Sequence, residues 1–509
     1  MLEADYSPWN LFEESCQKYF NNVMVIYNDK EYTYGQISEK AIDFSQCIKN
    51  WDFKIGGVYL PNSVEFITCM LALNKNKKAF VSLSYQFKGS ALIELINYTD
   101  IELLITDKKG YDAIKDRIDE TNIRVIMLLQ ESGEFESLEY SDKTKREIRD
   151  INENTFGICF TSGSTSTPKA IVLSNYAIVG NALSVAEHLG FTSDDKTIIP
   201  RSLAQASPIS GDVLMAISRG GTIIILNNVF HPAIFLKAIE QHKATNFYIV
   251  RTMLLQVLEY PKLNDFDLSS IKRILIGGMI NPLTIYQKTA EKFPWVKIYN
   301  AYGTSEASAR VSFGEHEDVI TLPCVIGKPM RGCGIKVYKD DGSEADIGEI
   351  GEVYIQSDFM MDCYYKNEQV TRESLSDKGF RTRDIGYKDE QGRFYVLSRN
   401  DDMIMQGGSR AYPIDIEEVL LKHEAVKECA VIGVDDEMLG QRIVALVCLK
   451  PESDAKTKDL FKWCMNELED RKVPKEIYII ESIPRNVIGK ISKKDVKDLY
   501  EQITSKKER

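Results

Sequence analysis

The chain of 509 residues lacks several features that would place it in a specialised class of protein. No stretch approaches the roughly 18 consecutive apolar residues of a membrane-spanning helix, so no membrane span is expected. Its ten cysteines show no CxxC spacing and its five histidines no paired metal-ligand spacing. Neither a disulfide framework nor a zinc site is therefore expected. The acidic N-terminal segment lacks the basic and apolar regions of a secretion signal, so the expected location is cytoplasmic.

Positive charge is also in short supply. The 63 lysines and arginines are outnumbered by 75 aspartates and glutamates, which gives a formal net charge of −12. This balance argues against nonspecific binding to nucleic acid or to an anionic membrane. With 44% hydrophobic and 27% charged residues, the chain is expected to be globular. Its length alone suggests about three domains.

The most informative stretch present is FTSGSTSTPKAIVL, at residues 160–173. Six hydroxyl side chains and one glycine precede Pro168 and Lys169. Hydroxyl groups, backbone N–H groups exposed by Gly163 and a lysine cation are suited to holding phosphate oxygens. The chain lacks the GxxxxGK[ST] spacing of a Walker loop. A flexible, hydroxyl-rich surface loop is the alternative interpretation.

Strand and helix patterns alternate through the first part of the chain. This alternation predicts an α/β fold, with parallel sheets covered by helices. Thr33 is a predicted helix N-cap, a helix is expected from about Gly211 to Ser218, and a strand-rich subdomain is expected from Gly351 onward. A charged helix or frayed tail is expected at 492–509. The predicted strands are at 101–107, 125–129, 170–173, 196–200, 221–226, 246–250, 430–434 and 443–449.

The hydroxyl-rich loop resembles the phosphate loop of the adenylate-forming superfamily, which includes acyl-CoA synthetases, stand-alone adenylation domains and firefly luciferase. The family pattern is roughly [YF]TSG[ST]TGxPKG, and this chain departs from it by carrying Ser166 and Ala170 where glycines are usual. The resemblance implies that the loop binds ATP phosphates and that Thr161 is a magnesium ligand. The matching residues are Thr161, Ser162, Gly163, Ser164, Thr165 and Lys169.

A second motif, YNAYGTSE at residues 299–306, is expected to form a ligand-facing turn rather than a strand. It is similar to the superfamily's Tyr-Gly-x-[TS]-Glu motif, which includes Gly303. The resemblance implies that Tyr302 packs on adenine, that Ser305 contacts the α-phosphate and that Glu306 binds Mg²⁺. Carboxylate and phosphate oxygens are the ligands that Mg²⁺ prefers.

Three further segments complete the nucleotide site by resemblance. Gly278 and Met279 stand where the family has a glycine followed by alanine beside adenine. Asp384 matches an aspartate that accepts hydrogen bonds from both ribose hydroxyls, a role that suits a carboxylate. Arg383 replaces the glycine that usually precedes this aspartate, and Arg399 matches a ribose or phosphate contact.

The resemblance extends through a small C-terminal domain. Its implied hinge is Asp401, so the predicted domains are an N-terminal AMP-binding domain at 1–400 and a small, mobile α+β domain at 401–509. Gly408 lies on the loop that admits pantetheine, and glycine lets a ligand pass close to the backbone. Lys490 ends a Pro-Arg-x-x-x-Gly-Lys signature and would bridge the substrate carboxylate and the α-phosphate. A solvated side chain is the alternative role for this lysine.

The predicted acyl pocket departs from the family pattern. The usual Pro-x-x-His sequence has Leu203 in place of histidine. Amino-acid-activating domains place an aspartate where this chain has Ser207, so an amino acid substrate is disfavoured. Arg251 stands where proline is usual, and it is predicted to pair with a second anionic or polar group of the substrate. A solvent-facing or structurally paired arginine is the alternative.

Together these motifs predict an ATP-dependent acid–thiol ligase of the acyl-CoA synthetase type. Its cofactors would be ATP and Mg²⁺, and its substrate a small carboxylic acid. Coenzyme A is the expected acceptor, and the phosphopantetheine of a separate acyl carrier protein is the alternative. A nucleotide-binding protein without catalytic activity is a remote alternative. The residues assigned to catalysis are Lys490, Glu306, Ser305 and Lys169.

Overall fold

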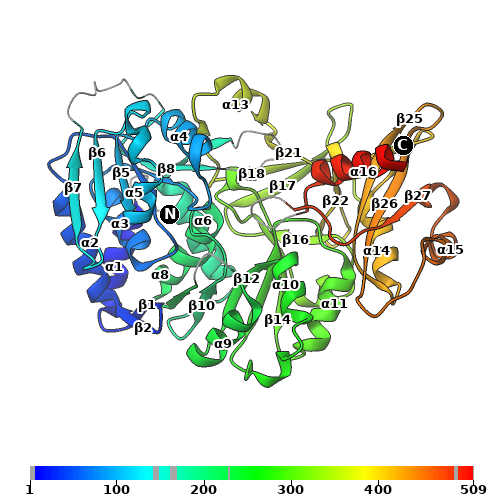
Figure 1. The fold of residues 1–509 in the computed structure, drawn as a ribbon, viewed down its shortest axis with the longest axis horizontal. Helices are drawn as coiled ribbons and strands as arrows, with labels where there is room; N and C mark the ends of the chain where they lie inside the picture. The colour runs from blue at the N-terminus through cyan, green and yellow to red at the C-terminus, as the bar shows by residue number, and fades with distance from the viewer. Residues whose placement is uncertain are drawn as a thin grey trace.

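The computed structural model of the protein describes residues 6–140, 148, 150–160, 169–226, 230–485 and 491–507 (Figure 1). Within these ranges the strands form three sheets, of fourteen, eight and five strands. The two larger sheets build the N-terminal part, and the five-stranded sheet lies at the C-terminal end of the chain. The predicted α/β class, with a strand-rich subdomain and a small α+β domain, is confirmed.

The eight-stranded sheet has a parallel centre and antiparallel edges. Its strand order is β19-β9-β8-β4-β3-β5-β6-β7. The parallel strands are β8 (Thr155–Phe160), β4 (Ala79–Ser82), β3 (Ile55–Tyr59), β5 (Leu103–Asp107) and β6 (Val125–Leu129). The antiparallel strands are β19 (Cys363–Tyr364), β9 (Ala170–Ser174) and β7 (Phe135–Glu139).

The fourteen-stranded sheet joins a parallel half to an antiparallel half. The parallel half contains β1 (Val23–Tyr27), β11 (Thr222–Ile225), β10 (Lys196–Ile199), β12 (Asn246–Val250), β13 (Arg273–Gly277) and β14 (Lys297–Tyr302). The short β2 (Lys30–Thr33) pairs with β1 in antiparallel orientation and forms the edge of this sheet. The antiparallel half is the predicted strand-rich subdomain: β15 (Ser312–Gly314), β16 (Val325–Pro329), β17 (Cys333–Tyr338), β18 (Gly351–Ser357), β20 (Leu375–Ser376), β21 (Gly379–Lys388) and β22 (Phe394–Arg399).

Helices form a layer between the two larger sheets. The largest hydrophobic cluster combines residues of both sheets with residues of α1 (Pro8–Tyr19), α3 (Val64–Lys75), α6 (Asn175–His188) and α8 (Met215–Arg219). Thr33 is the N-cap of α2, as predicted, because its side chain accepts a hydrogen bond from the Gln36 backbone. The remaining helices of this part are α2 (Tyr34–Ile48), α4 (Gly89–Tyr98), α5 (Lys108–Asp112), α9 (Pro232–His242), α10 (Arg251–Leu258), α11 (Leu283–Lys292), α12 (His316–Val319) and α13 (Glu368–Ser374).

Two sequence expectations need correction. The helix expected from about Gly211 begins earlier, because α7 (Ala206–Pro208) continues through a π-helical segment, η2 (Ile209–Leu214), into α8. Residues 299–302 do not belong to a turn. They form the end of β14, because their backbone groups pair with β13 and β15. The turn begins at Gly303 and leads into the 3₁₀ helix η4 (Ser305–Ala307).

The small C-terminal sheet contains β23 (Ile404–Gln406), β24 (Ser409–Ala411), β25 (Val426–Asp436), β26 (Gly440–Leu449) and β27 (Glu476–Ile479). Its helices are α14 (Pro413–Lys422), α15 (Thr457–Glu467) and α16 (Lys493–Lys507). In Figure 1 this part is coloured from orange to red. No helix among the described residues has the length and apolar character needed to cross a membrane.

Polar contacts link the small C-terminal part to the large part. The Glu418 side chain, on α14, accepts a hydrogen bond of 3.2 Å from the Thr284 backbone in the first turn of α11. Lys427 pairs with Glu259 at 3.2 Å, and Arg410 pairs with Asp340 at 3.0 Å. The first contact places a carboxylate at the positive end of a helix dipole, which is a favourable position.

Candidate active site

Three predicted nucleotide residues come together at the junction of the two halves of the fourteen-stranded sheet. The Tyr302 hydroxyl, at the end of β14, donates a hydrogen bond of 2.6 Å to Asp384 Oδ2 on β21. Arg399 Nε lies 3.3 Å from Asp384 Oδ1. Asp384 and Arg399 are direct partners in the pairing of β21 with β22. The sheet therefore assembles one carboxylate, one phenol and one guanidinium from distant segments.

Burial controls the protonation of this group. It raises the pKa of Asp384 above the usual aspartate value, although Arg399 and the hydrogen bond from Tyr302 act in the opposite direction. Burial and the neighbouring Asp384 also raise the pKa of Tyr302, so its hydroxyl stays protonated and donates. The side chain of Arg399 is 55% exposed, which leaves the cation accessible to a ligand.

A second cluster surrounds Glu306, which is 7% exposed and belongs to η4. The Tyr364 hydroxyl donates a hydrogen bond of 2.8 Å to Glu306 Oε1, and the Thr304 hydroxyl donates to Oε2. Lys169 Nζ lies 4.9 Å from the centre of the Tyr364 ring. Tyr364 reaches this position because β19 pairs with β9, the strand that begins directly after Lys169. A loop lysine and a buried carboxylate are thereby held around one aromatic ring.

The donor groups around Glu306 fit Mg²⁺ better than a metal ion that is held by three or more protein ligands. Among the described residues, no group of three or more histidine, cysteine, aspartate and glutamate side chains could hold a metal ion. Mg²⁺ usually takes one or two carboxylates, together with substrate phosphates and water. The buried Glu306 carboxylate, with the Thr304 hydroxyl beside it, meets this requirement.

Several predicted residues lie outside the described ranges. They are Thr161, Ser162, Gly163, Ser164, Thr165 and Lys490. Residues on either side of Lys490 are described, and Arg485 and Ile491 form a β-bridge. Farther along, Lys493 Nζ bonds to Glu417 Oε1 at 2.5 Å. Burial raises the pKa of Asp402, while the nearby Lys493 and Arg399 lower it. Asp402 is therefore within electrostatic reach of both Arg399 and Lys493, at the start of α16.

The remaining predicted residues lie in turns or in the short helix η4. Gly278 has φ of +86° and Gly408 has φ of +79°, a left-handed region that favours glycine. At Gly303 a Cβ atom would collide with the Ala309 carbonyl. Ser305 is the first residue of η4, and Met279 is half-buried beside Gly278. Among the described residues, no hydrogen bond or ion pair joins the hairpin turn of Gly408 to the two clusters.

Tyr364 and Thr304 contact Glu306 but were not predicted from the sequence. Thr304 lies inside the predicted motif, but no role was assigned to it. Tyr364 lies in a two-residue strand and contacts Glu306 from 58 positions away along the chain.

Arg251 is buried, which excludes the solvent-facing alternative and leaves the structurally paired alternative open. It begins α10, is 5% exposed, and its Nε has no hydrogen-bond partner among the described residues. Its charge lowers the pKa values of Tyr286 in α11 and Cys429 in β25, although burial raises both. Arg251 therefore faces α11 and the small C-terminal part.

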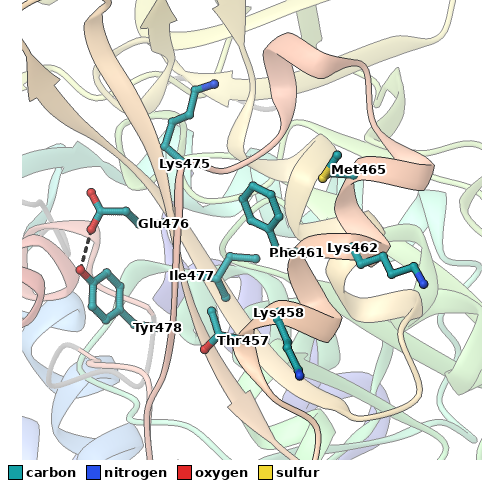
Figure 2. Close-up of a pocket in the computed structure, with 9 residues that line it drawn as sticks. All are labelled: Thr457, Lys458, Phe461, Lys462, Met465, Lys475, Glu476, Ile477 and Tyr478. Carbon is teal, nitrogen blue, oxygen red and sulfur yellow. Dashed lines mark hydrogen bonds between the residues drawn. The ribbon is translucent and has the colours of Figure 1, made fainter.

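A separate groove lies on the small C-terminal part, between α15 and β27. Figure 2 shows Phe461 of α15 among the lining residues, which include two lysines of α15, Lys458 and Lys462, and Lys475, which directly precedes β27. On the edge of the groove opposite Phe461, the Tyr478 hydroxyl donates a hydrogen bond of 2.5 Å to Glu476. None of the predicted site residues lines it. The lining residues are Thr457, Lys458, Phe461, Lys462, Met465, Lys475, Glu476, Ile477 and Tyr478.

Comparison with known proteins gives consistent results. Two family models match the chain, that of the AMP-binding enzymes at residues 12–365 and that of the AMP-binding enzyme C-terminal domain at residues 415–490. A 2-succinylbenzoate–CoA ligase of Bacillus cereus (strain ATCC 10987 / NRS 248) is 28% identical over 93% of this chain and 95% of its own length. A mitochondrial medium-chain acyl-CoA ligase of Mus musculus is 29% identical over 68% of this chain and 57% of its own length.

Solved structures share the fold. An anthranilate CoA ligase in complex with anthranoyl-AMP superposes with a TM-score of 0.88 at 21% identity, covering 98% of each chain. The o-succinylbenzoate coenzyme A synthetase of Bacillus subtilis, in complex with ATP and magnesium ion, gives a TM-score of 0.82 at 24% identity, covering 96% of this chain and 99% of the other. The first family model alone spans more than half of the sequence, and the chain therefore belongs to the AMP-binding enzyme family.

Proposed function

We propose that this enzyme uses MgATP to convert a carboxylic acid into an acyl-adenylate and pyrophosphate, and then transfers the acyl group to the thiol of coenzyme A. The predicted enzyme class, an ATP-dependent acid–thiol ligase, is confirmed by the family match and by the CoA-ligase relatives. The observation that carries the proposal is the assembly of Tyr302, Asp384 and Arg399 next to the segment that contains Glu306.

The two clusters suit the two ends of ATP. We assign the ribose hydroxyls to the Asp384 carboxylate, because an ionised carboxylate is a strong hydrogen-bond acceptor. Arg399 would contact the ribose or a phosphate, and Tyr302 and the Gly278–Met279 segment the adenine ring. By resemblance, Ser305 and Lys490 are assigned to the α-phosphate, and the loop residues Thr165 and Lys169 to the ATP phosphates.

Magnesium would be held by Glu306 and Thr161. When bound, it would offset the negative charge of the phosphates toward an incoming carboxylate. Lys490 would orient the substrate carboxylate for attack on the α-phosphorus, so that pyrophosphate leaves. No side chain needs to form a covalent bond with the acyl group.

The second half-reaction is supported by relatives rather than by contacts. The 2-succinylbenzoate–CoA ligase covers 93% of this chain, including the part around the Gly408 hairpin. We therefore propose coenzyme A as the acceptor and a small domain that moves about Asp401 between the two half-reactions. The acyl carrier protein stays an alternative acceptor, and the cytoplasmic location stays a prediction.

The test is pyrophosphate release from MgATP across a panel of aryl, fatty, amino and dicarboxylic acids, including 2-succinylbenzoate, with and without coenzyme A. We expect release with one acid class, faster turnover with coenzyme A, and a thioester product by mass spectrometry. Glu306→Gln should abolish release, whereas the exposed Glu317→Gln should not.

Two results would contradict parts of the proposal. Release that coenzyme A does not accelerate, with thioester found only on an added carrier protein, would reject coenzyme A as the acceptor. Tight AMP binding without pyrophosphate release for any acid would favour the inactive nucleotide-binding alternative.

A further inference from the structure

Two buried arginines lie over one tyrosine ring at the side of the candidate site. The guanidinium carbon of Arg201 lies 4.0 Å from the ring centre of Tyr248, and that of Arg310 lies 4.2 Å from it. Arg201 follows β10, Tyr248 belongs to β12, and Arg310 lies between η4 and β15. We call Arg201, Tyr248 and Arg310 the arginine cluster.

The cluster is not neutralised by its neighbours. Arg201 Nη2 donates to Asp212 Oδ2 at 2.5 Å, and Ser207 Oγ accepts from Arg201 Nη1 at 3.1 Å and from Arg310 Nη1 at 2.5 Å. Asp212 is the one acidic partner that the described residues give these two cations. The arginines are only 7% and 2% exposed. A buried cation without a counter-ion is costly, and burial lowers the pKa of Arg310.

The unused donors of Arg310 have a definite geometry. Its Nε and Nη2 are buried and have no hydrogen-bond partner among the described residues, and the same holds for Arg201 Nε. Nε and Nη2 form one edge of the planar guanidinium, and such an edge matches the two oxygens of a carboxylate. Arg310 thus presents a vacant two-donor edge.

The local backbone is built to hold Arg310 there. The Asn181 side-chain amide nitrogen donates to the Arg310 backbone carbonyl at 2.7 Å, and the Ser210 hydroxyl donates to Asn181 Oδ1 at 2.8 Å. Gly211, in the π-helical segment, packs directly on the guanidinium, since a Cβ atom there would lie 3.0 Å from Arg310 Cζ. The π-helical segment therefore makes room for this cation.

The cluster is next to the nucleotide site. Arg310 follows Glu306 by four residues, which span at most about 14 Å. The Tyr248 hydroxyl packs closely on Gly277, the residue before Gly278, since a Cβ atom added to Gly277 would lie 2.8 Å from it. A molecule whose carboxylate is held near Glu306 could therefore extend toward Arg310.

From this arrangement we propose that Arg310, supported by Arg201, binds a second carboxylate on the acid that the enzyme activates. The inference rests on the proposed function and narrows its substrate to dicarboxylic acids. One carboxylate is adenylated, and the other pairs with the Nε–Nη2 edge of Arg310. The same positive charge disfavours the ammonium group of an amino acid, because like charges repel at short distance in a buried site. In this proposal Arg310, and not Arg251, pairs with the second anionic group of the substrate.

The first arm of the test uses the unmodified full-length enzyme. Pyrophosphate release is measured with 2-succinylbenzoate and with the aliphatic diacids from succinate to suberate, each against its monomethyl ester. Esterification neutralises one carboxylate and changes little else. We expect kcat/KM for the preferred diacid to exceed that of its ester by about 100-fold, the discrimination expected when charged hydrogen bonds are lost.

The second arm uses variants with a matched control. Arg310→Gln should lower kcat/KM for the diacid by about 100-fold and leave the ester within about threefold, which removes the preference. Arg310→Lys keeps the charge but loses the two-donor edge, so kcat/KM for the diacid should fall by about tenfold. Arg251→Gln, at another buried arginine with an unpaired Nε, should keep the diacid preference. AMP binding and thermal unfolding show that each variant is folded.

The outcomes separate the inference from the proposed function. Equal use of diacids and esters by the unmodified enzyme, or a preference that survives in Arg310→Gln, would overturn the inference while pyrophosphate release upholds the ligase. If Arg310→Gln does not fold, Arg310→Lys and the ester comparison decide. If no acid releases pyrophosphate, the proposed function fails. Equilibrium binding of diacid and ester to the AMP-loaded enzyme then decides the inference, and equal affinities overturn it.

Discussion

The Tyr364 hydroxyl donates a hydrogen bond of 2.8 Å to Glu306, the carboxylate assigned to magnesium. Burial and the neighbouring Glu306 raise the pKa of this phenol, so it remains a donor throughout the physiological pH range. The same ring lies beneath the Lys169 ammonium group. Tyr364, on β19, therefore positions both Glu306 and Lys169, which lie in two other segments of the chain.

Replacing Tyr364 by phenylalanine should raise the Mg²⁺ concentration needed for half-maximal pyrophosphate release by about tenfold. The physical reason is the loss of a hydrogen bond to a buried charged group, typically about 1.5–3 kcal/mol. The measurement is a Mg²⁺ titration at saturating ATP. Tyr365→Phe is the matched control, because the Tyr365 hydroxyl bonds to Asp100 at 2.8 Å instead. An unchanged Mg²⁺ requirement in Tyr364→Phe would refute the positioning role.

AMP binding should weaken by about tenfold as the pH falls through the pKa of Asp384, because a protonated carboxyl loses its strongest acceptor interactions. That pKa is raised by burial, so the loss begins at a higher pH than for an ordinary aspartate. Calorimetric titration between pH 7 and 4 tests this. Asp384→Asn should bind weakly at every pH. A pH-independent affinity in the unmodified enzyme would contradict the assignment.

Protonation of Asp384, which should weaken AMP binding, should increase the stability of the folded protein. The folded-state pKa of Asp384 lies above the unfolded value, so protonation favours the folded protein. The contribution of this group to the free energy of unfolding therefore increases as the pH falls through the folded pKa. Asp384→Asn should remove that contribution.

Lys490→Ala should reduce adenylation by at least about 100-fold, because the positive charge that the resemblance assigns to the reacting groups is lost. Transfer of the acyl group from a supplied acyl-adenylate to coenzyme A should remain within about threefold, since the resemblance assigns Lys490 to the first step. Separate assays of the two half-reactions measure this. The exposed Lys494→Ala serves as the control. Equal losses in both half-reactions would argue for a general structural role.

Arg383→Gly should stabilise the protein. Arg383 has φ of +61°, a left-handed conformation that costs a non-glycine residue roughly 1–2 kcal/mol. The greater entropy of glycine in the unfolded chain offsets part of this gain, so we expect a net increase of about 0.5–1 kcal/mol. Urea unfolding followed by fluorescence measures it. Arg381→Gly, which removes the 2.9 Å pair with Glu352, should destabilise instead. A lower stability of Arg383→Gly would show that the 4.0 Å pair with Asp401 outweighs the strain.

Local patterns predicted most of the elements because those elements depend on local chemistry. The strand at 125–129 and the Thr33 cap follow from hydrophobic pattern and capping, and the structure contains both. The segment 299–302 was misassigned because its polar residues suggest a turn. Its conformation is fixed by neighbouring strands on both sides. Pairing between strands that are distant in sequence cannot be seen in a short window.

The same limit applies to the site. Motif resemblance selected Tyr302, Asp384 and Arg399, and the structure brings all three together. It did not select Tyr364, because that contact depends on the pairing of β19 with β9. Leu203 and Ser207 indicated an altered acyl pocket, but the sequence indicated Arg251 as the residue that pairs with a second anionic group of the substrate. Only the fold reveals which arginines share the ring of Tyr248.

The contact between Glu418 and the Thr284 backbone has a consequence for the timing of the reaction cycle. Glu418 caps the first turn of α11 from the opposite domain. Any rotation of the small domain must therefore uncap that helix, and water must solvate its freed amide before the thiol can be admitted. Such exchanges of one hydrogen bond for another have low net cost. Under the proposed rotation, the contact would act as a reversible latch that opens without unfolding either partner.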